Sequence, residues 1–75
     1  MFRYKINLVG YKDVTDFVNT VSTVEEAVLI KSGKYCGNAK SLLNVLASLE
    51  WGDVICESER DIQRLIDKYI VGESN

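Results

Sequence analysis

Few side chains in this sequence of 75 residues are of the kinds that carry out catalysis or hold a cofactor. There is no histidine, so the chain lacks the usual general base near neutral pH and the commonest metal ligand. Two cysteines, Cys36 and Cys56, are too few and too far apart for a zinc site or a disulfide framework. We expect them to be partly buried thiols in a reducing compartment.

The charged side chains do not form a recognisable reactive site either. The acidic residues have neither the spacing of a calcium-binding loop nor that of a catalytic carboxylate pair, so we expect solvated surface at Glu25, Glu26, Glu57, Glu59 and Asp61. Lys31, Lys34 and Lys40 could gather an anion, but such lysines more often form a solvated face. The sequence therefore predicts no catalytic residue, no metal ligand, no cofactor and no enzymatic activity.

Ser41 stands directly before the most leucine-rich part of the chain. Its hydroxyl can cap a helix by accepting a backbone N–H two or three residues further on. Leucine or valine occupies positions 42, 43, 45, 46 and 49, which is too many for one narrow stripe facing a core. A helix of this kind either lies deep in a core or presents part of its surface to a partner, and a short chain has little core to offer.

Composition places the chain among globular proteins, with 47% hydrophobic and 27% charged residues, and predicts a single domain over residues 1–75. The net charge of −2 argues against an overall attraction to nucleic acid. Residues 1–5 alternate in character, so they do not resemble a signal peptide, and no apolar segment approaches the length of a membrane span. We expect a cytoplasmic protein with neither a membrane nor a nucleic-acid partner.

The first half of the chain predicts a strand, a helix and a hairpin. Apolar residues at positions 2, 4, 6 and 8 alternate with polar ones, as in a strand with one buried face. Asp13 can cap a helix in which Val14, Phe17, Val18 and Val21 have helical spacing. Residues 27–31 and 34–37 are the two arms of a hairpin that turns at residues 32 and 33.

The second half predicts a helix, a strand and a final helix. The helix capped by Ser41 ends near Trp51, where Gly52 can take a left-handed conformation. A short strand covers residues 54–56. Ser58 opens the last helix, which Gly72 closes and whose apolar series is Ile62, Leu65, Ile66, Tyr69 and Ile70. The resulting order, βαββαβα, favours an α+β fold in which helices cover one face of an antiparallel sheet.

The element order, the length and the segment 38–46 resemble HPr, the small phosphocarrier of the bacterial sugar phosphotransferase system. HPr proteins carry Asn-Leu-Lys-Ser followed by apolar residues at this place, and here the sequence reads Asn-Ala-Lys-Ser-Leu-Leu-Asn-Val-Leu. The resemblance extends loosely over the whole chain, and this segment is its one motif. It implies an HPr-like open-faced sandwich, a four-stranded antiparallel sheet in the order 1-4-2-3 with three helices on one face.

The chain departs from HPr where HPr performs its chemistry. HPr carries its phosphoryl group on a histidine within Gly-Ile-His-Ala-Arg-Pro-Ala, at the start of the first helix. Aligning that helix with this sequence places the histidine near Gly10, the arginine near Lys12 and the proline near Asp13. Gly10 has no side chain to phosphorylate, and the phenol of Tyr11, with an ordinary pKa of about 10, is a poor substitute for imidazole. The resemblance therefore implies a relative without phosphohistidine carrier activity.

Two other features of the family can carry over. In many HPr proteins of Gram-positive bacteria a dedicated kinase phosphorylates the serine that corresponds to Ser41, and here a phosphate would lie at a helix N-terminus beside Lys40. Ser41 could instead be a helix cap only. In the family, residues matching Leu42, Leu43 and Leu46 form an exposed patch that docks onto phosphotransferase enzymes and regulators. Some of these leucines could instead point inward or be ordinary surface.

We therefore expect a non-catalytic, HPr-like regulatory or protein-binding module of the bacterial cytoplasm. Its partner would be a phosphotransferase-system component, an HPr kinase or a regulator. Ser41 is the candidate for regulatory phosphorylation, and the expected partner-binding residues are Tyr11, Lys12, Lys40, Leu42, Leu43 and Leu46. The alternative is a structural domain that uses its leucines to associate with identical chains.

Overall fold

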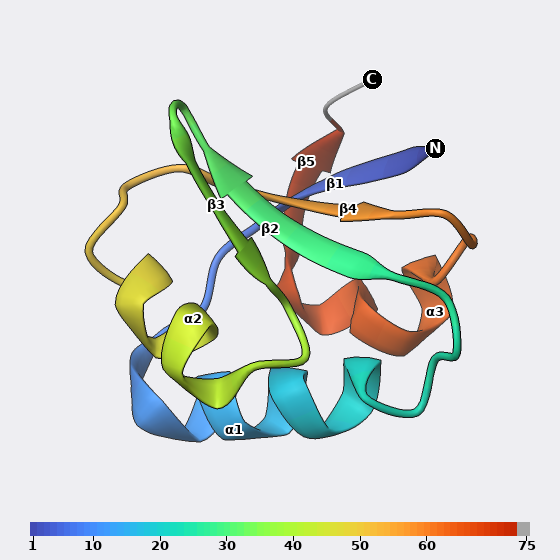
Figure 1. Ribbon diagram of the computed structural model, residues 1–75, viewed down its shortest axis with the longest axis horizontal. Helices are drawn as coiled ribbons and strands as arrows, with labels where there is room; N and C mark the ends of the chain where they lie inside the picture. Colours follow the sequence, from blue (N-terminus) through green and yellow to red (C-terminus); the bar gives the residue numbers. More distant parts are fainter. Residues whose placement is uncertain (74–75) are drawn as a thin grey trace.

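Alternating strands and helices build one sheet with a helical layer beneath it (Figure 1). The computed structural model describes residues 1–73. Its elements are β1 (Phe2–Ile6), α1 (Gly10–Val21), β2 (Val28–Ser32), β3 (Tyr35–Asn38), α2 (Leu42–Ser48), β4 (Val54–Ser58), α3 (Gln63–Ile66), the 3-10 helix η1 (Asp67–Tyr69) and β5 (Ile70–Glu73). The α+β class with an antiparallel sheet and three α-helices agrees with the prediction from the sequence.

The four-stranded sheet in the order 1-4-2-3 is wrong. The sheet has five strands in the order β3-β2-β4-β1-β5, and every neighbouring pair is antiparallel. The difference is β5, which pairs with β1 through Ile6↔Ile70, Lys5↔Gly72 and Tyr4↔Glu73. As a result β1 is an inner strand with a neighbour on both sides.

The predicted final helix is mostly wrong, because the end of that segment forms strand β5. Ser58 does not open a helix, since it pairs with Phe2 and Val28 as the last residue of β4. Its hydroxyl accepts the Arg60 N–H at 3.1 Å. The helical part is limited to α3 and η1, and Ile70 already belongs to β5. Pairing of this segment with β1 satisfies backbone groups that an edge strand would leave open, and β-branched Ile70 and Val71 suit a strand.

The core lies between the helices and one face of the sheet. The inward-pointing strand residues are Tyr4, Ile6, Val28, Ile30, Val54 and Cys56, all of them buried. From the helical side, α1 buries Val14, Phe17, Val18 and Val21, which confirms the periodicity predicted for this helix. Tyr69 of η1 meets the Phe17 ring edge-on at a centroid distance of 5.7 Å, so the C-terminal segment closes the same core.

The hairpin follows the prediction with small shifts at its ends. β2 and β3 pair from Leu29↔Asn38 to Ser32↔Tyr35, so Gly33 and Lys34 form the turn. Gly33 has φ +56°, a left-handed conformation that non-glycine residues rarely adopt.

Helix α2 is shorter than predicted. It ends at Ser48, whose hydroxyl donates to the Val45 carbonyl at 2.6 Å. Trp51 lies beyond the helix and stacks on Tyr35, with ring centroids 5.4 Å apart. Gly52 does take a left-handed conformation, φ +86°, but in the turn that leads to β4. No helix within residues 1–73 combines the length and apolar character needed to cross a bilayer.

The two cysteines differ sharply in environment, contrary to the expectation that both are partly buried. Cys36 is exposed on β3, whereas Cys56 is buried on β4. Burial and the neighbouring Glu57 charge raise the pKa of the Cys56 thiol to about 12.

We predict that a thiol reagent such as Ellman's reagent, at about pH 8, modifies one cysteine in the folded protein and both in denaturant, because only a thiolate that is accessible reacts. Cys36→Ser should remove the fast reaction and leave the reaction that requires unfolding. Rapid modification of both thiols in the native protein would contradict the burial of Cys56.

Candidate functional site

The start of α2 is tied to the edge of the sheet. Ser41 is the N-cap, as predicted, and its Oγ accepts the Asn44 N–H at 3.4 Å. Asn44 Oδ1 in turn accepts the Asn38 N–H at 3.0 Å, and the Ser41 N–H donates to the Asn38 carbonyl at 3.0 Å. The Asn44 side chain also fills the space over Gly37, where an added Cβ would lie 2.8 Å from Oδ1. The first turn of α2 and strand β3 are therefore held as one unit.

The outward side of α2 carries exposed leucines and no charged side chain. Leu43 leaves 76% of its surface exposed, and Leu42 and Leu49 are also exposed. Val45 is fully buried and Leu46 packs partly against the core. We call Leu42, Leu43 and Leu49 the leucine surface. The predicted docking residues Leu42 and Leu43 lie on it, whereas Leu46 lies beneath its edge.

Lys40 has a structural contact that the sequence did not indicate. Its ammonium donates to the Val24 carbonyl and lies 3.5 Å from the Glu25 carbonyl. It thus fastens the start of α2 to the segment between α1 and β2. A phosphate on Ser41 would have to compete with these carbonyls for the Lys40 ammonium.

The start of α1 differs from the prediction in its cap. The helix begins at Gly10, whose φ is +75°, and Asp13 lies in its first turn, not before it. The Asp13 carboxylate instead accepts the Val9 N–H at 2.8 Å. Tyr11 and Lys12 are exposed there. Helix α2 packs on α1 and lies over its N-terminal half (Figure 1), so the two predicted parts of the docking region belong to neighbouring helices.

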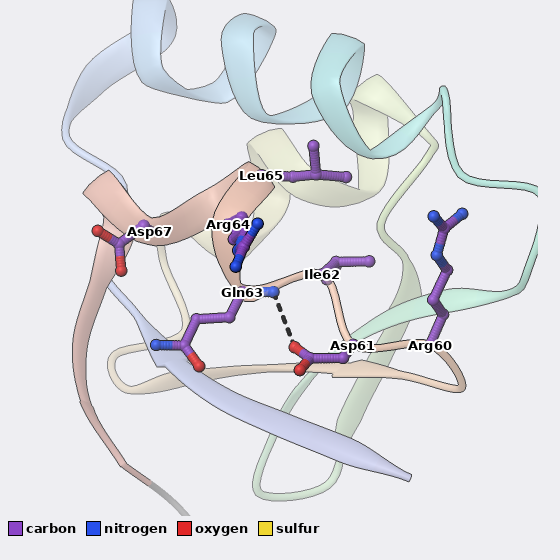
Figure 2. Close-up of a pocket in the computed structure, with 7 residues that line it drawn as sticks. All are labelled: Arg60, Asp61, Ile62, Gln63, Arg64, Leu65 and Asp67. Carbon is purple, nitrogen blue, oxygen red and sulfur yellow. Dashed lines mark hydrogen bonds between the residues drawn. The ribbon is translucent and has the colours of Figure 1, made fainter.

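A cleft of about 860 Å³ lies elsewhere, beside α3 (Figure 2). Arg60 and Asp61 reach it from the loop before α3, and Gln63 and Arg64 from the helix itself. With Asp67 also in its wall, its positive and negative side chains balance. None of the residues predicted from the sequence to bind a partner lines it.

A buried hydroxyl connects this cleft to the sheet. Tyr4 on β1 donates to Asp61 Oδ1 at 2.8 Å and accepts the Ile62 N–H at 3.0 Å. Asp61 also accepts the Gln63 N–H at 3.1 Å, and this bond closes a turn before α3. An aspartate two residues before a helix favours such a turn, so the turn could have been predicted from the sequence. Burial, with the Asp61 hydrogen bond second, raises the pKa of Tyr4 to about 12.

The same bonds make Asp61 a poor base. The Gln63 backbone N–H, followed by the Tyr4 hydroxyl, holds the pKa of Asp61 below its ordinary value. A general base that works near neutral pH needs the opposite shift. In this cleft Asp61 is therefore suited to accepting hydrogen bonds and not to taking up a proton near neutral pH.

Glu57 is not solvated surface, which corrects the prediction for this residue. Only 5% of Glu57 is exposed, although it points to the sheet face opposite the helices. Its two carboxylate oxygens contact Arg3 Nε at 2.8 Å and Lys31 Nζ at 2.9 Å. Hydrogen bonds from Lys31 and then Arg3 lower the pKa of Glu57. Arg3, Lys31 and Glu57 all occupy outward strand positions. The alternation of inward and outward residues along β1, β2 and β4 could have indicated that these side chains share one face.

Within residues 1–73 no group of three or more cysteine, aspartate or glutamate side chains is placed to hold a metal ion. No protein-family model matches this chain, and it matches neither a curated protein nor a solved structure. The assignment of function therefore depends on the surfaces described above.

We predict that Tyr4→Phe lowers the free energy of unfolding by about 1–3 kcal/mol, because the Ile62 N–H and Asp61 lose their shared partner in a buried place. Urea unfolding at neutral pH measures this. Since folding raises the Tyr4 pKa from 10.0 to about 12, the folded state binds this proton more tightly. The stability that this tighter proton binding contributes is complete below about pH 10 and is lost as the pH rises through about 12. The stability difference between wild type and variant should shrink over that range, and a constant difference would contradict the assignment.

Proposed function

We propose that this protein is a non-catalytic, HPr-like regulatory module that binds a protein partner through the leucine surface of α2. The observation that carries the proposal is the exposure of Leu42, Leu43 and Leu49 on a helix without a charged residue. Charged residues make up 27% of the whole chain, whereas α2 contains none. Leu42 and Leu43 are neighbours in the first turn of α2, and exposed apolar side chains that gather into a patch usually mark an interaction site.

The strand pairings add support from the fold. Without β5, the neighbours β1–β4, β4–β2 and β2–β3 are those of the HPr arrangement, and helices lie on one side of them (Figure 1). By the resemblance to HPr, Ser41 corresponds to the regulatory serine of the family, and as the N-cap of α2 it directly precedes Leu42 of the leucine surface. Since the chain has no histidine, the proposed role is recognition without phosphohistidine transfer.

The proposed regulatory step is transfer of the γ-phosphoryl group of ATP to Ser41 Oγ, with release of ADP and a proton. The bond from Ser41 Oγ to the Asn44 N–H is long, at 3.4 Å, so the hydroxyl is only weakly held. A phosphate there would add a charge of about −1.5 to −2 next to Leu42 and change the docking of an apolar partner.

We predict that Leu42→Ser with Leu43→Ser reduces partner binding at least about tenfold, since two exposed apolar contacts at an interface centre are worth more than 1 kcal/mol together. Native cell extract of the source organism, passed over immobilised protein and quantified by mass spectrometry, measures this. The matched control is Leu65→Ser with Val71→Ser, which removes two exposed apolar side chains from α3 and β5. Partners retained equally by both variants would exclude the leucine surface.

Self-association through the same surface is the competing explanation. Sedimentation equilibrium over a concentration series separates the two. A mass that rises with concentration in wild type and not in the Leu42→Ser, Leu43→Ser variant would assign the leucines to a contact between identical chains.

We predict that an HPr kinase with ATP adds one phosphoryl group to the protein, and that Ser41→Ala prevents it. Intact-mass spectrometry gives the result directly. Loss of the cap should cost about 0.5 kcal/mol, at the low end for such caps because the bond is long, so the variant stays folded. An unmodified wild-type protein would leave Ser41 as a helix cap, while the leucine surface would still be tested by the preceding experiment.

A further inference from the structure

The sheet face opposite the helices has no element on it within residues 1–73 (Figure 1). Because Tyr4, Ile6, Val28 and Ile30 point into the core, the residues between them point to this open side. Cross-strand pairs place these side chains in two rows. One row runs Lys5, Ile55, Lys31 and Cys36, and the other runs Arg3, Glu57, Leu29 and Asn38. We call Arg3, Lys5, Leu29, Lys31 and Ile55 the open-face surface.

Glu57 holds two of the three cations of this surface, Arg3 and Lys31, in place. It bonds Arg3 through Nε, and among the described side chains no acceptor bonds the two terminal nitrogens of the guanidinium, which can donate to an acidic group. The Arg3 side chain is 57% exposed and that of Lys31 41% exposed, although the buried carboxylate holds Arg3 at Nε and Lys31 at its terminal Nζ. Donors positioned in advance lose less side-chain freedom when an acidic group binds.

The open face has the opposite charge to the rest of the protein. Three cations and Glu57 give it a net charge of +2, whereas the whole chain carries −2, so all remaining residues together carry −4. Positive charge is thus concentrated on one side of an acidic molecule. Such a separation orients an approaching acidic partner toward this face.

The surface also contains apolar area. Leu29 and Ile55 are only partly buried. Ile55 lies between Lys5 and Lys31 in one row, and Leu29 lies beside Glu57 in the other. None of the strand positions that point to this side within residues 1–73 carries an aromatic side chain, so there is no platform on which nucleic-acid bases could stack. The combination favours a polypeptide with both acidic and aliphatic residues.

We propose that the open-face surface binds an acidic, aliphatic segment of a partner protein. The segment lies across the outward side chains of the sheet. At the β3 edge, the N–H and carbonyl of Asn38 are already taken by Asn44 and Ser41, which obstructs the addition of a strand there. This surface lies on the other side of the sheet from α2, so it and the leucine surface are independent.

The test uses the capped hexapeptide Glu-Leu-Glu-Glu-Leu-Glu as probe and the amide shifts of the full protein by NMR. Shifts should concentrate on β1, β2 and β4, and the apparent Kd should rise with added salt. Lys5→Gln with Lys31→Gln should weaken binding about tenfold, since each partly exposed charge contributes up to about 1 kcal/mol. Lys12→Gln with Lys68→Gln removes the same charge from the helical layer and should change the Kd by less than about twofold.

Several results would overturn the proposal: no shifts at millimolar peptide, shifts on α2 or the α3 cleft, or equal weakening in both double variants. A single-stranded oligothymidylate that binds the same face more tightly than the peptide would assign it to nucleic acid instead. If Lys31→Gln destabilises the fold through Glu57, Lys5→Gln alone leaves the Arg3–Glu57–Lys31 contacts intact and should still weaken binding about threefold.

Discussion

Strand β1 is bonded on both edges, and most of the structure depends on that position. On one side it pairs with β4, and on the other with β5, which brings the end of the described chain back beside its beginning. Its inward side chains contribute to the core, and the Tyr4 hydroxyl secures the loop before α3. Its outward Arg3 is one of the two cations that neutralise Glu57. The packing of the core, the position of the C-terminal segment and the charge pairs of the open face therefore all depend on β1.

The elements that could be predicted from the sequence are those determined by local spacing. The buried face of α1 follows from valines and a phenylalanine three and four residues apart, and the hairpin turn follows from Gly33. The C-terminal segment could not be predicted in this way. Its apolar residues fit a helical period, but β1 offers a free edge to Ile70 and Val71, and a periodicity argument contains no information about distant partners.

In the candidate sites, too, some features follow from local residue types and others depend on distant contacts. The Ser41 cap and the exposure of Leu42 and Leu43 follow from the residue types in that segment. Which apolar residue faces inward, however, is decided by the packing of α2 on α1, which buries Val45 and leaves Leu46 at the margin. The burial of Glu57 depends on two cations from different strands, so it could only be inferred once the register was known.

The bonds that join Asn38 to Ser41 and Asn44 have a consequence for how the protein behaves at high concentration. A strand at the rim of a sheet is a template onto which another chain can polymerise, and here the first turn of α2 occupies backbone groups of that rim. Any event that unwinds this turn would uncover those groups together with Gly37. The helix start and the solubility of the folded protein are thus coupled, and a modification at Ser41 would act on both.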